Sequence, residues 1–89
     1  MNIKYVISRF DLFGEPPTHR IVGFTISSES NDSKEYVETL VELKKCKKKS
    51  DFDICKVAYK QLKDEIKIVV RKIESKSSIL GYEFIPTDD

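Results

Sequence analysis

The chain has 89 residues, of which 39% are apolar and 35% are charged, and its net charge is +1. This composition is too apolar for a disordered chain and too polar for a membrane protein, and the length corresponds to one domain over residues 1–89. A domain of this size has a single core, so a catalytic cleft between two lobes is not expected.

The first predicted element is a strand over residues 2–12. Apolar side chains occupy every second position from Ile3 to Ile7, and the alternation then continues on the other parity at Phe10 and Leu12. Apolar residues on both parities are typical of a strand that is covered on both faces. We therefore expect this strand to be buried and central in its sheet.

Two further strands are predicted before the middle of the chain. Residues 20–28 place Val22, Phe24 and Ile26 on one face, and a polar turn follows them. Residues 35–44 fit either a strand or a short helix. The strand is favoured, because β-branched residues prefer a pleated surface and the preceding turn suits a hairpin.

Residues 51–74 have the strongest periodicity in the chain. Apolar residues recur at alternating steps of three and four, which predicts one stripe along a helix. Ser50 and Asp53 are typical of an N-terminal cap. The branched segment 66–70 has low helix propensity, so the helix is expected to fray or end early there. The stripe consists of Phe52, Cys55, Tyr59, Leu62, Ile66, Val69 and Ile73.

A last strand is predicted over residues 78–85, where Leu80, Tyr82 and Phe84 share one parity. The predicted fold is therefore α+β in the order β-β-β-α-β. It is a small mixed four-stranded sheet with one amphipathic helix packed on one face. A right-handed crossover places the last strand parallel to the first, so the preferred sheet order is 4-1-2-3.

The cysteine content favours a cytoplasmic protein with reduced thiols. Small secreted domains usually have four or more cysteines, whereas this chain has only Cys46 and Cys55. The N-terminal segment also lacks the apolar run and cleavage site of a signal peptide. Two cysteines and one histidine are too few for a zinc site, so no metal is expected.

Motifs for catalysis are missing from the sequence. His19 is the only histidine, and it lies in a predicted hairpin loop without a nucleophile at a recognisable spacing. The three glycines are isolated, so no phosphate-binding loop is predicted. We therefore expect no enzyme activity and no cofactor, and we interpret His19 as a surface residue.

A run of lysines between the third strand and the helix is the sharpest local feature. Burying even one unpaired ammonium is costly, so the run must face water or an acidic partner. A solvated connection is the favoured interpretation, ahead of an acidic protein surface. Nucleic acid is third, because the run lacks the interleaved aromatic residues that stack on bases. The run consists of Lys44, Lys45, Lys47, Lys48 and Lys49.

Phe13 is a large apolar residue beside a glycine and two prolines, so it is either a contact for a partner or a lid on the core. With His19 and the lysine run it completes the set of candidate contacts. The leading hypothesis is a non-enzymatic protein-binding or regulatory accessory module of a bacterium or phage. It would act through its surface or a sheet edge, on another protein or as a homodimer. The alternative is a nucleic-acid-associated protein that uses the run Lys44–Lys49.

Overall fold

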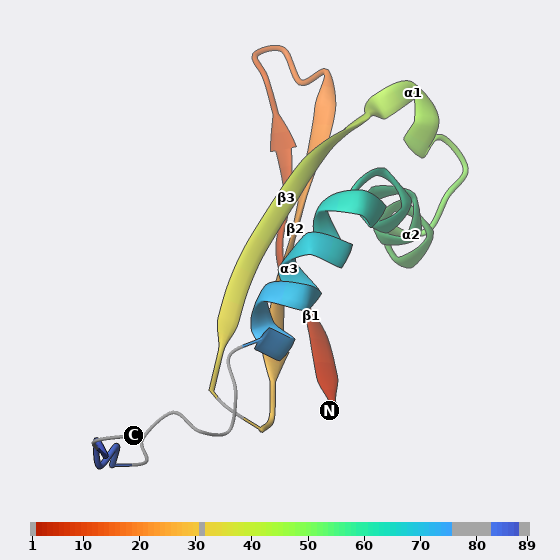
Figure 1. The fold of residues 1–89 in the computed structure, drawn as a ribbon. Helices are drawn as coiled ribbons and strands as arrows, with labels where there is room; N and C mark the ends of the chain where they lie inside the picture. Colours follow the sequence, from red (N-terminus) through yellow and green to blue (C-terminus); the bar gives the residue numbers. More distant parts are fainter. Residues whose placement is uncertain (1, 31, 76–82, 88–89) are drawn as a thin grey trace.

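The computed structural model describes residues 2–30, 32–75 and 83–87. The described part of the chain forms an antiparallel sheet followed by helices, which confirms the α+β class (Figure 1). The strands are β1 (Ile3–Phe13), β2 (His19–Ser28) and β3 (Lys34–Glu42). The helices are α1 (Leu43–Cys46), α2 (Asp51–Gln61) and α3 (Lys63–Ser75).

The sheet is a meander with the order β1-β2-β3, and β2 is its central strand. The strand favoured over residues 35–44 is confirmed as far as Glu42, where the chain enters α1. The expected four-stranded order 4-1-2-3 is not observed among the described residues. Residues 83–87 have neither strand nor helix structure, and the other part of the predicted strand 78–85 lies outside the described residues.

The expectation that the first strand is buried and central is wrong. β1 is an edge strand of the described sheet, and most of its residues are exposed. Ile7 pairs with Phe24, and after a bulge at Ser8, Phe10 pairs with Val22. A bulge inserts one extra residue into a strand, so the apolar residues before and after it face the same side. The change of parity in the sequence therefore marks a bulge rather than a second covered face.

The core lies between one face of the sheet and the helices α2 and α3. The chief contacts of α2 are with β3, and those of α3 are with β2 and β3. The helix layer is therefore centred over β2 and β3. The buried core cluster contains Val22, Phe24, Ile26, Val37, Val41, Ile54, Cys55, Ala58, Leu62, Ile66 and Ile73.

The single predicted helix is two helices that meet at Leu62, and Figure 1 shows α3 leaving α2 in a new direction. At the end of α2, the Gln61 side chain donates hydrogen bonds to the Leu40 carbonyl (2.9 Å) and to Thr39 Oγ1 (3.0 Å). These bonds tie the helix end to β3. The expected fraying at 66–70 is wrong, because this segment lies inside α3.

The predicted cap is confirmed, since Ser50 Oγ accepts a hydrogen bond from the Asp53 backbone N–H at 3.1 Å. The predicted stripe is confirmed only in part. Phe52 and Tyr59 are 65% and 40% exposed, because they lie on a flank of α2 rather than on its buried face. Among the other predicted residues, Cys55, Leu62, Ile66 and Ile73 are buried and Val69 is half-buried.

Replacing Leu62 with alanine tests the junction of the two helices. Leu62 is 4% exposed, so Leu62→Ala should lower the free energy of unfolding by about 2–5 kcal/mol. Phe52→Ala is the matched control, because Phe52 is 65% exposed and its loss should cost less than about 1 kcal/mol. Urea denaturation of both variants measures the difference, and a loss below about 0.5 kcal/mol for Leu62→Ala would contradict this packing.

Candidate functional site

Several of the candidate contacts predicted from the sequence meet at one end of the sheet. Phe13 at the end of β1 pairs with His19 at the start of β2, and His19 pairs with Glu42 at the end of β3. The Leu43 backbone N–H then donates to the Thr18 carbonyl at 3.1 Å, which holds the start of α1 at the same end. This end of the sheet therefore joins Phe13 and His19 to the beginning of the lysine run.

The five lysines of the run are all exposed. Lys44 Nζ lies 3.0 Å from Glu42 Oε2, and this hydrogen bond and charge lower the pKa of the Glu42 carboxyl. Lys48 has a positive φ of 60°, so the run changes direction before α2 begins. The run thus forms an exposed basic connection and is separate from the groove described next.

A groove lies between β1 and the flank of the two long helices. One part has a volume of about 430 Å³ and lies against α3. A second part of about 230 Å³ lies against α2. Tyr5 of β1 and Tyr59 of α2 line both parts, so the two parts adjoin at this pair of side chains.

Exposed apolar side chains form the floor of this groove. Tyr5 and Ile7 of β1 are 45% and 46% exposed, although both are on the face of the sheet that carries the helices. Phe52 and Tyr59 face them from α2. These side chains stay exposed because the helix layer is centred over β2 and β3 and leaves the inner face of β1 uncovered.

The two tyrosines of the groove pack edge to face. Their ring centroids are 5.9 Å apart, and Tyr59 makes a second edge contact with Phe24 at 6.3 Å. Burial raises the pKa of the Tyr5 hydroxyl, and a charge interaction and a side-chain hydrogen bond with Tyr59, followed by the charge of Glu74, raise it further. Tyr5 therefore keeps its proton at neutral pH, and its hydroxyl already interacts with Tyr59.

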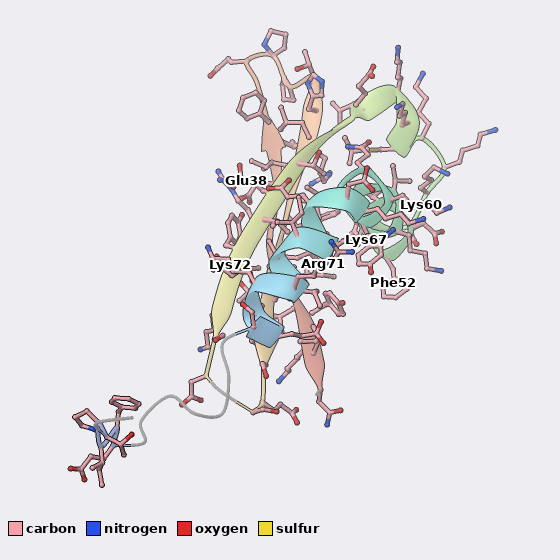
Figure 2. All side chains as sticks on the ribbon, viewed as in Figure 1. Glu38, Phe52, Lys60, Lys67, Arg71 and Lys72 are labelled. Carbon is pink, nitrogen blue, oxygen red and sulfur yellow. The ribbon has the colours of Figure 1, made fainter. Side chains whose placement is uncertain are left out.

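Basic side chains form the rim of the groove along α3. Lys63, Lys67 and Arg71 follow one another at intervals of four residues, so they share one flank of the helix. Figure 2 shows Lys67 and Arg71 on the side of α3 away from Lys72. Lys72 is on the opposite flank and pairs with Glu35 of β3 at 3.1 Å.

Two observations concern metal binding and thiol reactivity among the described residues. These residues hold no cluster of three or more histidine, cysteine or acidic side chains that suits a metal. Burial, with a smaller effect of Asp51, raises the pKa of the Cys55 thiol in the groove wall, which disfavours the reactive thiolate. The same part of the chain has no helix that is both long and apolar enough to span a membrane.

Comparison with known proteins supplies no relative whose function can be transferred. No family model, curated protein or solved structure matches the chain. The function therefore has to be inferred from the groove and from the unpaired edge of β1.

No pattern in the sequence predicts this groove. The interval of four between Lys63, Lys67 and Arg71 is visible in the sequence. The role of this row depends on Tyr5, which is more than fifty residues away in a strand that the sequence predicts to be buried. Only the position of the helix layer on the sheet brings these side chains together.

Alkylation of the native protein tests the two thiols. Both cysteines are free, with Cys46 half-buried and Cys55 buried. Without reductant, Cys46 should be labelled first, because Cys55 is less accessible and its raised pKa lowers its thiolate fraction. Mass spectrometry follows each site, and unfolded protein should be labelled at both. Protection of both sites in unfolded protein until reductant is added would contradict free thiols.

Proposed function

We propose that this protein is a non-enzymatic binding module that holds an extended segment of a protein partner against β1. One observation carries the proposal: the helices cover β2 and β3, while Tyr5 and Ile7 on the inner face of β1 remain about half exposed. Among the described strands, only β2 pairs with β1, so the other edge of β1 has no strand partner. An unpaired edge accepts an added strand through backbone hydrogen bonds.

A segment paired with β1 would also fill the groove. An added strand lies about 4.8 Å from its neighbour, and every second side chain points to the same face of the sheet. Half of the side chains of such a segment would therefore point to the side of the sheet that carries α2 and α3. Backbone pairing would supply affinity, and the groove would select the side chains.

A simple estimate indicates that the apolar floor needs help from other contacts. Completing the burial of a large apolar side chain that is half exposed gives about 1 kcal/mol. The four exposed floor residues would therefore give about 4 kcal/mol. The loss of translational and rotational freedom alone costs about 4–15 kcal/mol. Binding thus requires the open edge of β1 and the polar rim in addition to the floor.

A nucleic-acid partner is the second candidate, because the groove places aromatic rings beside basic side chains. Single-stranded nucleic acid binds where bases stack on rings in a basic groove. The rings of Tyr5 and Tyr59, however, meet at 84°, and Tyr59 also packs edge-on against Phe24. Because these rings already support one another, a peptide segment is the favoured occupant. The role of the lysine run in nucleic-acid binding stays a prediction.

The wider context of the module is also a proposal. Its composition favours a cytoplasmic accessory protein of a bacterium or phage, which would act by occupying a surface of its partner. A homodimer is compatible with the same open edge, since two copies of β1 can pair antiparallel.

Selection from a displayed library of random twelve-residue peptides tests the proposal. Enriched peptides should shift the backbone amide signals of β1 in NMR spectra. Ile7→Ser should weaken their binding at least tenfold, because it removes an apolar contact from the groove floor. Val6→Ser is the matched control, because Val6 is 42% exposed on the opposite face of the same strand.

Three results would count against this function. The first is a failure to enrich any peptide. The second is a set of enriched peptides that shift signals elsewhere and leave β1 unchanged. The third is equal weakening by Ile7→Ser and Val6→Ser, which would show that the groove face of β1 has no special role.

A further inference from the structure

We propose that the groove selects an acidic segment, whose carboxylates on alternate residues pair with Lys63, Lys67 and Arg71. This inference rests on the proposed function, because it requires an extended segment beside β1. It adds the chemical class of the partner and the side of the groove that recognises it.

These three cations have no acidic partner in the described part of the chain. Lys63, Lys67 and Arg71 are all exposed, and none of them forms a salt bridge with a described carboxylate. Two neighbouring cations on the same helices do have partners. Lys72 lies 3.1 Å from Glu35, and Lys56 lies 4.0 Å from Asp53. The charge on the groove rim is therefore available to a ligand.

The spacing of the three cations along α3 is close to the spacing of alternate side chains on a strand. Residues four apart on a helix are separated by about 6 Å along its axis, because each residue rises 1.5 Å. Alternate residues of a strand are separated by about 6.8 Å, and they point to the same face. A row of three cations along α3 thus matches carboxylates at every second position of a segment that runs beside it.

The charges at the C-terminal end of the row limit where carboxylates can bind. Arg71 can bind a carboxylate through two parallel hydrogen bonds. Glu74 lies beyond Arg71 in the same wall and would repel a carboxylate. The acidic positions of the segment should therefore lie beside residues 63–71 and stop before Glu74.

The lysine run supplies a matched control for this row. A triple substitution of Lys47, Lys48 and Lys49 by glutamine removes three positive charges, as does the triple substitution K63Q/K67Q/R71Q. Both sets of side chains are exposed, so neither variant should unfold the protein. Only the second set lines the groove.

The test uses two synthetic nine-residue peptides that differ only in charge. One alternates threonine with glutamate and the other alternates threonine with glutamine. In NMR titrations at 50 mM salt, the glutamate peptide should shift β1 amides and bind at least tenfold more tightly than the glutamine peptide. K63Q/K67Q/R71Q should abolish this preference, and K47Q/K48Q/K49Q should retain it. Raising the salt to 300 mM should reduce the preference several-fold, because the charges are exposed.

Each other outcome overturns the inference in a distinguishable way. If both peptides bind along β1 with equal affinity, the proposed function stands and the acidic preference is wrong. If neither peptide shifts β1, the acidic preference is wrong, and the library selection decides separately whether β1 binds peptides at all. If both triple variants weaken binding equally, general charge attraction explains the binding, and the row on α3 is not a specific site. If a ten-residue oligothymidylate binds the same groove more tightly than the glutamate peptide, nucleic acid is the preferred ligand.

Discussion

The packing of α2 and α3 onto β2 and β3 is the contact on which the rest of the structure depends. It buries Val22 and Ile26 from the central strand together with Leu62 and Ile73 from the helices. A domain of this size has apolar surface for only one such layer. Because the layer is centred on two of the three described strands, β1 is held mainly by its pairing with β2. The exposed floor of the groove is the direct consequence.

The same arrangement explains why the groove combines two kinds of chemistry. The side of α2 that borders β1 presents the aromatic residues Phe52 and Tyr59, whereas its buried face holds Ile54, Cys55 and Ala58. The side of α3 that borders β1 presents lysine and arginine, whereas the opposite side is neutralised by the pair Lys72–Glu35. An apolar floor with a cationic rim suits a ligand that is both extended and acidic. A ligand lacking either property would leave part of the groove without complementary contacts.

The sequence predicts the regular elements of this fold better than their arrangement. The periodicity of β2 and the cap at Ser50 are local signals, and both are confirmed. The bulge at Ser8 mimics a strand that is buried on both faces, so the pattern led to the wrong position for β1. The junction at Leu62 has no glycine or proline, and the contacts that accompany it, from Gln61 to β3, are distant in sequence. For the site, the lysine run predicts contacts at one end of the sheet. The groove instead depends on where the helices lie relative to β1, which no local pattern reveals.

The central claim, that β1 has an open edge, can be tested directly by amide hydrogen exchange of the free protein followed by NMR. In an edge strand, the N–H groups alternate between those bonded to the neighbouring strand and those that face away from it. Along β1, alternating slow and fast exchange is therefore predicted, interrupted at the Ser8 bulge, whereas the amides of the central strand β2 should all exchange slowly. Uniformly slow exchange along β1 would contradict the account, because it would mean that another segment already pairs with that edge.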